Sequence, residues 1–279
     1  MDKKVLGSAA EPVVKSVITE QSQIAAEPVL KACGLTKVFS RRGLPEVVAA
    51  DQISFELMPG ECLGIIGESG SGKSTVVNMI ARLLDVTAGE IILEGENITH
   101  SKGNELRRIY RKMQMVFQTP ADSFDPRRTL GDGIGESLRN SGMSKAAALQ
   151  RVNALLEQCG LTPDFADRYP HEVSGGQCQR AAIARALAIG PKLLICDEAT
   201  SALDVTIQKE IMELLSNLRR QQGGSLSILF ICHDIALVQQ FCDRILVMYK
   251  GRIVEEGIPD EVIRNPQNEY TKRLIESVL

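Results

Sequence analysis

The feature that most constrains the fold is a glycine-rich loop between an apolar run and a helix-forming stretch. Residues 67–74 read Gly-Glu-Ser-Gly-Ser-Gly-Lys-Ser and fill the pattern G-x-x-x-x-G-K-[S/T]. The apolar run 62–66 before them is typical of a buried strand, and a helix is predicted from about Ser74 to Leu84. Glycines let the loop turn its N–H groups toward an anion, which also faces the positive end of the helix dipole. The loop therefore predicts a nucleotide phosphate site in an α/β fold.

The residue types in this loop also predict individual roles. Lys73 is expected to reach the β- and γ-phosphates, and Ser74 is expected to ligate Mg²⁺. An ordinary Gly/Ser-rich turn is the alternative, but it leaves the lysine, the hydroxyl, the strand and the helix unexplained. The predicted ATP-binding set is Gly67, Glu68, Ser69, Gly70, Ser71, Gly72, Lys73, Ser74 and Thr75.

Length and composition restrict the classes of function. A chain of 279 residues can form one large domain or two small ones with a substantial core. Its net charge of −3 gives no electrostatic reason to expect nucleic acid as the main partner. The seven cysteines are scattered without a C-x-x-C pair, which favours reduced thiols that pack as small hydrophobes. No stretch approaches the roughly eighteen apolar residues of a membrane span, so membrane work would need another chain's helices.

The N-terminal part is predicted to be an extension followed by β structure. Residues 9–15 nearly repeat as residues 25–31, and only the second copy leads directly into a strand. Residues 1 to about 27 are therefore interpreted as an extension, whose first copy could pair as an edge strand. From 29 to 57 the pattern predicts short β segments, with a boundary at Asp51.

The remainder alternates apolar strands with amphipathic helices. Strands are predicted at 193–196 and 227–232, with a helix at about 206–222 between them. This alternation predicts a mainly parallel sheet covered on both faces, with ligands beyond the carboxyl ends of its strands. Another helix is predicted at 145–158 with Ser144 as its N-cap, and its inward face is expected to hold Leu149, Val152, Leu155, Leu156 and Cys159.

A buried strand that ends in two carboxylates supplies what a phosphate site needs beside its loop. Residues 193–198 read Leu-Leu-Ile-Cys-Asp-Glu. Asp197 is predicted to hold Mg²⁺ through its water shell, and Glu198 to orient and polarise the attacking water. An apolar strand ending in Asp-Glu is by itself more often an ordinary strand end. Its position downstream of a complete phosphate loop favours the catalytic interpretation.

A Ser-Gly-Gly turn forms the third motif. Residues 173–180 read Val-Ser-Gly-Gly-Gln-Cys-Gln-Arg and precede an apolar helical stretch, which places the serine hydroxyl and the glycine N–H groups at a helix N-terminus. Alone, this is a turn and an N-cap. Together with the phosphate loop, Gln118, the Asp-Glu pair, the segment 201–204 and His233, it resembles the ATP-binding subunit of an ABC transporter over residues 29–279.

The resemblance implies a domain organisation. It implies an ABC-type P-loop NTPase over residues 28–279, with a mainly parallel sheet core, an antiparallel β subdomain and an α-helical subdomain at about 120–185. A C-terminal family segment would cover about 257–279. Residues 1–27 lie outside this domain, and their purpose is left open.

The resemblance also implies roles for single residues. Phe39 would stack on adenine, although an aromatic residue in a β segment is usually core. His233 would hold the γ-phosphate, Gln118 would sense the membrane partner, and Asp204 would organise a dimer contact. The ATP of an opposing subunit would be bound by Ser174, Gly175, Gly176 and Gln177. The implied catalytic residues are Glu198, His233 and Gln118, and the implied Mg²⁺ ligands are Ser74, Gln118 and Asp197.

Three further segments narrow the resemblance. The stretches 169–177, 124–127 and 265–271 are similar to the importer ATPases for oligopeptides, dipeptides and nickel. This implies an enzyme that hydrolyses ATP, with Mg²⁺, to drive uptake of peptides or nickel or metal chelates. Its partners would be transmembrane permease subunits, a second ATPase subunit that is generally a different chain, and indirectly an extracytoplasmic substrate-binding protein. It would lie peripherally at the cytoplasmic face of the membrane.

Two other classes of function compete with this interpretation. A soluble ABC ATPase acting on nucleic acid or ribosomes usually carries long coiled-coil, zinc-binding or tandem-domain insertions, and the sequence between the phosphate loop and Ser174 has none. A regulatory subunit that binds ATP without hydrolysis would lack the catalytic glutamate or histidine, whereas Glu198 and His233 are both present. Cargo, and whether the partner ATPase is identical or different, stay open.

Overall fold

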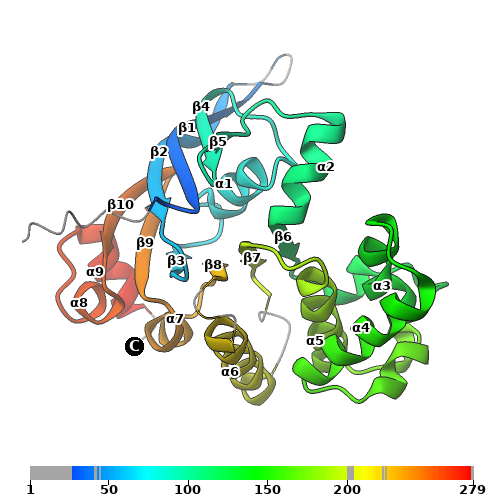
Figure 1. The fold of residues 1–279 in the computed structure, drawn as a ribbon. Helices are drawn as coiled ribbons and strands as arrows, with labels where there is room; N and C mark the ends of the chain where they lie inside the picture. The colour runs from blue at the N-terminus through cyan, green and yellow to red at the C-terminus, as the bar shows by residue number, and fades with distance from the viewer. Residues whose placement is uncertain are drawn as a thin grey trace, which may run out of the picture.

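A six-stranded sheet lies at the centre of the computed structural model, which describes residues 27–40, 43, 45–199, 204–221, 223 and 225–277 (Figure 1). Its strand order is β10-β9-β3-β8-β7-β6. All neighbouring pairs are parallel except the β9–β10 hairpin. The strands are β3 (Cys62–Ile66), β6 (Met113–Val116), β7 (Leu193–Asp197), β8 (Ser227–Ile231), β9 (Arg244–Tyr249) and β10 (Arg252–Gly257).

An antiparallel sheet in the order β2-β1-β4-β5 covers one side of the molecule. Buried side chains of this sheet, of helix α1 and of the inner strands form one continuous apolar cluster. Helix α1 therefore lies between the two sheets, which confirms the predicted α/β class with a parallel core and an antiparallel sheet. The elements are β1 (Leu30–Phe39), β2 (Val47–Leu57), β4 (Ala88–Leu93), β5 (Glu96–Asn97) and α1 (Lys73–Ile80).

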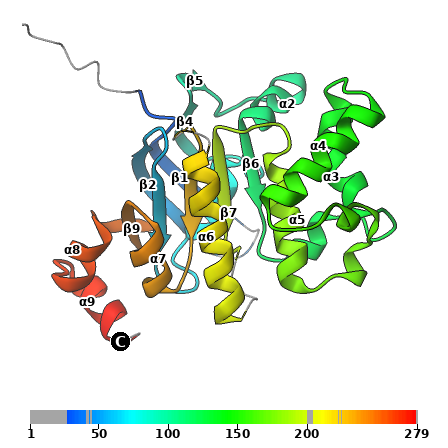
Figure 2. The ribbon, with the colours of Figure 1, turned by 60° about the horizontal axis from the view of Figure 1, so that its bottom comes forward.

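Helices cover the opposite face and the β6 edge of the parallel sheet. In Figures 1 and 2, α3, α4 and α5 form a group beside β6. Helices α6 and α7 lie below β7, β8 and β3 in Figure 1 and come to the front in Figure 2. A second apolar cluster joins these helices to the sheet. The bounds are α2 (Gly103–Lys112), α3 (Leu130–Asn140), α4 (Lys145–Gln158), α5 (Gly175–Leu187), α6 (Val205–Gln221), α7 (Ile235–Phe241), α8 (Pro259–Arg264) and α9 (Glu269–Glu276), with short 3₁₀ turns at Pro120–Ser123, Pro163–Asp167 and Pro170–Glu172.

Helix α4 tests the amphipathic pattern. It spans the predicted residues, and the Ser144 hydroxyl accepts a hydrogen bond from the N–H of Ala147 at 3.3 Å. Leu149 was expected to face inward, and this prediction is wrong because its side chain is 51% exposed. The buried residues Ala148 and Val152 are four apart and define the inward stripe, so Leu149 lies about 100° around the helix from Ala148.

Helix α1 ends at Ile80, earlier than the predicted end at Leu84. Arg82 adopts a left-handed φ of 56°, which a helix cannot continue through. The N–H groups of Leu83 and Leu84 both turn back to the carbonyl of Asn78, at 2.9 and 3.0 Å. The early end leaves Leu83 55% exposed on the surface.

The predicted boundary at Asp51, the N-terminal extension and the absence of a membrane span are the remaining sequence expectations. Strand β2 runs through Asp51, so the boundary predicted there is wrong. Asp51 stays extended because its N–H donates to the carbonyl of Gly251 and its carboxylate accepts from Arg252. The extension up to residue 26 and the segment 201–203 lie outside the described residues. Within the described ranges, no helix has the length and apolar character needed to cross a bilayer.

Candidate functional site

The phosphate loop connects β3 to α1, as the motif predicted. Its glycines at 67, 70 and 72 have φ values of 149°, 80° and 106°. A Cβ at Gly67 would lie 2.3 Å from the Met248 carbonyl oxygen, and one at Gly72 would lie 2.3 Å from the Ala49 carbonyl oxygen. Backbone from β9 and β2 thus closes around the loop, so both glycines are required by close approach as well as by φ.

Lys73 lies beneath the loop with its ammonium group turned inward. Its Nζ donates hydrogen bonds to the carbonyls of Gly67 at 2.7 Å and Glu68 at 2.9 Å. Burial lowers the pKa of Lys73, while the carboxylates of Glu198 and Asp197 oppose this shift by favouring the charged form. The structure therefore brings the predicted phosphate-binding lysine and the predicted acidic pair into one electrostatic neighbourhood.

Asp197 and Glu198 stand at the carboxyl end of β7. Oδ1 of Asp197 is buried without a hydrogen-bond partner among the described residues. Burial raises the pKa of Asp197, the Glu198 charge adds to this, and Lys73 opposes it. Glu198 has a φ of 48°, an unfavourable conformation for a residue with a Cβ, and its N–H donates to the Ile231 carbonyl at 3.1 Å. Such strain next to a phosphate loop is typical of a functional site.

This arrangement fits a Mg²⁺ ion. A buried carboxylate oxygen without a donor is a hard ligand that a cation would satisfy. The buried Oγ of Ser71 in the loop likewise has no partner in the described part of the chain. Ser74 is exposed in the first turn of α1, and Gln118 is exposed two residues after β6 ends. No group of three or more His, Cys, Asp or Glu side chains in the described ranges could hold a metal alone. The ion would therefore need phosphate oxygens or water as well.

Two more residues predicted for this half of the site, Phe39 and His233, stand at or just after the ends of strands and are exposed. Phe39 is the last residue of β1 and is 43% exposed, with the Lys37 ammonium 5.3 Å from its ring centre. It is therefore not a core aromatic residue. His233 follows the end of β8 and is exposed at the same edge of the sheet as Asp197.

The Ser-Gly-Gly turn forms the N-terminus of α5. Oγ of Ser174 accepts from the N–H of Gln177 at 3.3 Å, and Oε1 of Gln177 accepts from the N–H of Ser174 at 2.9 Å. This capping box places the serine hydroxyl at a helix N-terminus, as the motif predicted, and it is also the N-cap of the ordinary-turn alternative. A Cβ on Gly176 would lie 2.7 Å from Cγ2 of Ile207, so a glycine here allows α6 to pack closely against α5. No hydrogen bond or ion pair between described residues joins 174–177 to the phosphate loop.

Asp204 has a local structural role that the sequence did not indicate. Its Oδ1 accepts from the N–H of Ile207 at 3.0 Å, and its carbonyl accepts from Gln208 at 2.9 Å, so it caps the start of α6. The side chain is exposed. Its predicted part in a dimer contact stays a prediction.

The seven cysteines all lie in described residues and are free thiols. Burial raises the pKa of Cys159, Cys196 and Cys232 to about 12 and that of Cys178 to about 11. Such thiols are protonated and unreactive at neutral pH. All but Cys33 are buried, in agreement with the predicted packing role.

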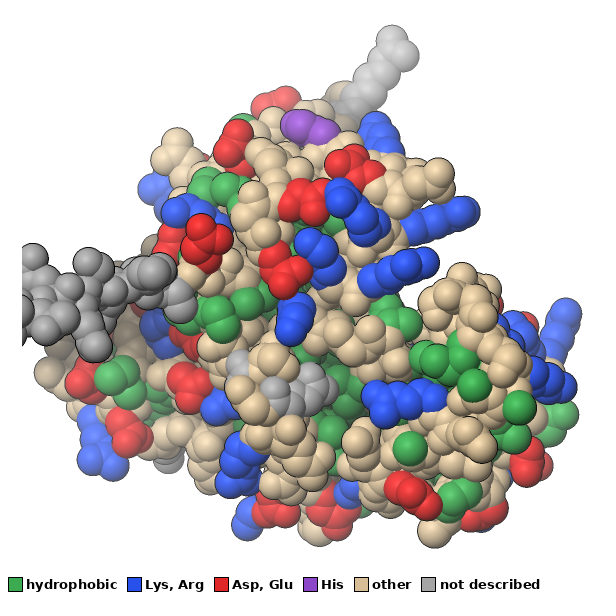
Figure 3. Space-filling view, in the orientation of Figure 1, with side chains coloured by type: hydrophobic (Ala, Val, Ile, Leu, Met, Phe, Trp, Pro, Cys, Tyr) green, Lys and Arg blue, Asp and Glu red, His purple; other side chains and the backbone are tan. Residues whose placement is uncertain are grey.

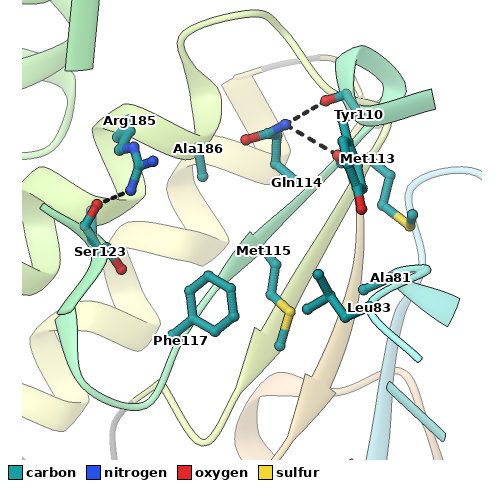
Figure 4. Close-up of a pocket in the computed structure, with 11 residues that line it drawn as sticks. Ala81, Leu83, Tyr110, Met113, Gln114, Met115, Phe117, Ser123, Arg185 and Ala186 are labelled. Atoms are coloured by element: carbon teal, nitrogen blue, oxygen red, sulfur yellow. Dashed lines mark hydrogen bonds between the residues drawn. The ribbon is translucent and has the colours of Figure 1, made fainter. Parts of the chain in front are cut away.

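Sequence reasoning missed a surface groove between α1, β6 and α5, with a volume of about 310 Å³ (Figure 4). Leu83 and Phe117, which is 42% exposed, line it with Met115. Arg185 borders the groove, and its guanidinium donates to the carbonyl of Ser123. No sequence signal pointed to this groove: Leu83 was predicted inside a helix, and its exposure follows from the early end of α1.

A basic hollow adjoins this groove. It is lined by Arg107, Arg108 and Arg111 of α2 together with polar residues of α3, and it shares Tyr110 and Gln114 with the groove. Figure 3 shows the blue side chains of this region above the hollow. Arg108 pairs with a glutamate of β5, whereas Arg107 and Arg111 form no ion pair with another described residue.

Comparison with known proteins gives the chain a family. The ABC transporter family pattern matches residues 50–201. The glutathione import ATP-binding protein GsiA of Salmonella paratyphi A is 46% identical over 279 residues, covering 97% of this chain and 44% of that protein. The protein of the same name from Escherichia coli K12 is 46% identical, covering 94% and 43%. The chain thus spans less than half the length of these curated relatives.

Solved structures share the fold. The ATP-binding cassette MJ0796, described in a dimeric post-hydrolysis state bound to ADP and Pi, has a TM-score of 0.75 at 32% identity, covering 82% of this chain and 98% of that chain. The cbiO1 protein of Clostridium perfringens, part of the ABC transporter complex cbiONQ, has a TM-score of 0.76 at 28% identity, covering 90% and 94%. By its sequence motifs, its fold and the matched pattern, the chain belongs to the ABC transporter family.

Proposed function

We propose that this chain is the ATP-binding subunit of an importer and hydrolyses ATP, with Mg²⁺, to drive uptake. The observation that carries this proposal is the buried Lys73 ammonium beneath the phosphate loop, facing the strand-end carboxylates Asp197 and Glu198. A triphosphate is the ligand that satisfies these groups together, because it offers anionic oxygens to the lysine and to the loop N–H groups.

In this proposal, hydrolysis follows from the positions of the side chains. Phe39 stacks on the adenine ring, and the loop from Gly67 to Thr75 holds the phosphates. Glu198 accepts a proton from the water whose oxygen attacks the γ-phosphorus, and the bond from that phosphorus to the bridging oxygen breaks to release ADP and phosphate. Gln118 orients the same water, and His233 holds the γ-phosphate.

The metal has a defined place in this scheme. Ser74, Gln118 and Asp197 would hold Mg²⁺, which supplies positive charge that stabilises the charge developing on the phosphate oxygens. The partnerless Oδ1 of Asp197 supports this assignment.

The site is completed by a second ATPase subunit. Ser174, Gly175, Gly176 and Gln177 bind the γ-phosphate of the ATP held by that subunit, and Asp204 lies at the contact. The exposed N-terminus of α5 supports this role, because the dipole and free N–H groups of a thirteen-residue helix favour an anion there. The partner is identical or a second, different ATPase chain.

The groove beside β6 is the docking surface for a transmembrane permease subunit. Its apolar floor with Leu83 and Phe117 fits the apolar face of a short helix, and the adjacent Arg107 and Arg111 fit acidic side chains on the same segment. Gln118 follows Phe117 directly, so a segment in the groove lies beside the nucleotide site.

The docking surface can be tested by charge reversal. Substitution of Arg107 and Arg111 by Glu is expected to reduce co-purification of the chain with its permease and to leave ATP affinity unchanged. Exchange of exposed Arg220, on the far end of α6, for Glu is the matched control. Full recovery of the permease with the double variant would contradict the charge complementarity.

Cargo and location complete the proposal. Curated relatives are named for glutathione import, which favours a small peptide over nickel or a metal chelate. An extracytoplasmic substrate-binding protein delivers that cargo to the permease, and the chain acts peripherally at the cytoplasmic face of the membrane. Mass spectrometry of the complex, purified from membrane with its cargo-binding protein, would identify the partner ATPase and the ligand.

The decisive experiment is Glu198→Gln in the assembled complex. The variant should bind ATP and accumulate as a closed dimer. Its rate of ATP hydrolysis should fall by about 100-fold or more, as expected for loss of a general base. Glu90→Gln, at an exposed position of β4, is the control and should keep wild-type turnover. Wild-type turnover in Glu198→Gln would contradict the catalytic role of Glu198. A regulatory subunit would be favoured if the complex showed no detectable hydrolysis when only its partner ATPase is inactivated.

A further inference from the structure

The C-terminal helix α9 contacts the phosphate loop directly. The hydroxyl of Tyr270, the second residue of α9, accepts a hydrogen bond from the backbone N–H of Glu68 at 3.0 Å. The two residues are 202 positions apart, and Tyr270 is only 4% exposed. This bond joins the loop to a residue that has no part in the proposed binding of the nucleotide.

Three contacts hold Tyr270 in position. Its ring stacks on Tyr249, at the end of β9, with 4.0 Å between ring centres and 25° between planes. Its N–H donates to the Asn268 side chain at 2.9 Å, which caps α9. The carboxylate of Glu255 in β10 accepts from the N–H groups of Gln267 at 2.8 Å and Asn268 at 3.0 Å. The sheet edge therefore fixes where the Tyr270 hydroxyl points.

Lys73 holds the same stretch of loop from the opposite side. Its ammonium donates to the carbonyls of Gly67 and Glu68. The peptide group that joins Gly67 to Glu68 therefore has its carbonyl bonded to the lysine and its N–H bonded to the tyrosine. A triphosphate attracts the ammonium, and these carbonyls then lose a donor. The tyrosine bond to Glu68 does not depend on Lys73 and stays available.

We propose that Tyr270 is a positioning residue for nucleotide binding, whose hydroxyl keeps the Glu68 peptide in place when Lys73 turns to the phosphates. The inference rests on the proposed function, since it needs a triphosphate in the loop. It predicts that α9 contributes to nucleotide affinity without touching the nucleotide.

Tyr270→Phe tests this directly in the full-length chain. The variant keeps the ring and its stack on Tyr249 but removes the acceptor. Affinity for a fluorescent ATP analogue with Mg²⁺ should fall by about two- to ten-fold, the range for one neutral hydrogen bond, and the Glu68 amide should exchange its hydrogen faster. Tyr249→Phe is the matched control, because its hydroxyl makes no hydrogen bond to a described residue, and it should leave both measurements unchanged.

Thermal unfolding of both variants separates positioning from general destabilisation. Weaker binding by Tyr270→Phe at a temperature where both variants are fully folded supports the inference, together with faster Glu68 exchange. Wild-type affinity and wild-type Glu68 exchange in Tyr270→Phe would overturn it and leave the proposed function standing. Equal losses in the two variants would also overturn it. Absence of ATP binding by the wild-type chain would overturn the proposed function as well.

Discussion

The phosphate loop and the Ser-Gly-Gly turn are both glycine-rich helix N-termini, yet they are held in different ways. The loop is tied to distant parts of the chain, since Glu68 bonds to Tyr270 and the Ser71 carbonyl accepts from the N–H of Gly251 at 2.8 Å. The turn at 174–177 is held by hydrogen bonds within its own capping box. One glycine-rich helix start is thus tied to distant elements, and the other is held by bonds among its own residues.

This difference has a physical consequence for binding. Lys73 is buried, and burial disfavours its charged form until an anion or a carboxylate compensates. Ser174 is exposed and stays hydrated. Its attraction for an anion therefore becomes strong only when another surface excludes solvent from it. The loop should therefore determine whether nucleotide binds, and the turn should determine whether bound nucleotide reacts.

The largest predicted effect is that substitutions in the loop and in the turn impair different steps, ATP binding and ATP hydrolysis. Lys73→Ala should weaken ATP binding and reduce hydrolysis by about 100-fold or more, because a charge is removed from the phosphates. Ser174→Ala should reduce hydrolysis by about ten-fold or more, with ATP affinity of the isolated chain unchanged. Equilibrium binding and steady-state hydrolysis by the assembled complex measure the two effects.

Each of these variants has a matched control. Ser144 caps α4 through the same 3.3 Å bond as Ser174 in α5, so Ser144→Ala should have a similar stability loss of about 1 kcal/mol and normal hydrolysis. Lys192→Ala, just before the opposite end of β7, controls for loss of a lysine. Equal losses of ATP affinity in Lys73→Ala and Ser174→Ala would erase the distinction between the two sites.

A smaller effect concerns pH and the buried carboxylate of the loop site. Burial raises the pKa of Asp197 above its ordinary value of 3.8, so the folded state binds this proton more tightly than the unfolded state. The contribution of Asp197 to stability is therefore present below that value and lost as the pH rises through the raised pKa. In Mg²⁺-free buffer, Asp197→Asn should be more stable than wild type at neutral pH, and the gain should shrink toward pH 3.8.

Denaturant unfolding across this pH range measures the effect. Asp85→Asn is the control of opposite sign, because a hydrogen bond from Arg82 lowers the pKa of the exposed Asp85. It should give no gain in stability at neutral pH. A gain in Asp197→Asn that is independent of pH would show that the substitution acts through something other than titration of this carboxylate.

Local patterns predicted much of the fold and of the site. The bounds of α4, the Ser174 cap and the strand that ends at Asp197 follow from short-range periodicity and capping chemistry, which nearby residues determine. Leu149 was misassigned because several apolar residues crowd α4 and only packing selects the inward face. The early end of α1 at Arg82 is a backbone turn that its apolar pattern does not show.

By itself, the sequence determined the anion-binding chemistry of this protein, because glycine spacing, a lysine and a helix start within a few residues of one another are enough to form a phosphate loop. Only the tertiary structure decided what surrounds that loop. The bond from Glu68 to Tyr270 and the groove at Leu83 and Phe117 depend on how the β9–β10 hairpin, α9, β6 and α5 pack. Contacts between residues so far apart are set by the packing of whole elements, which no local pattern encodes.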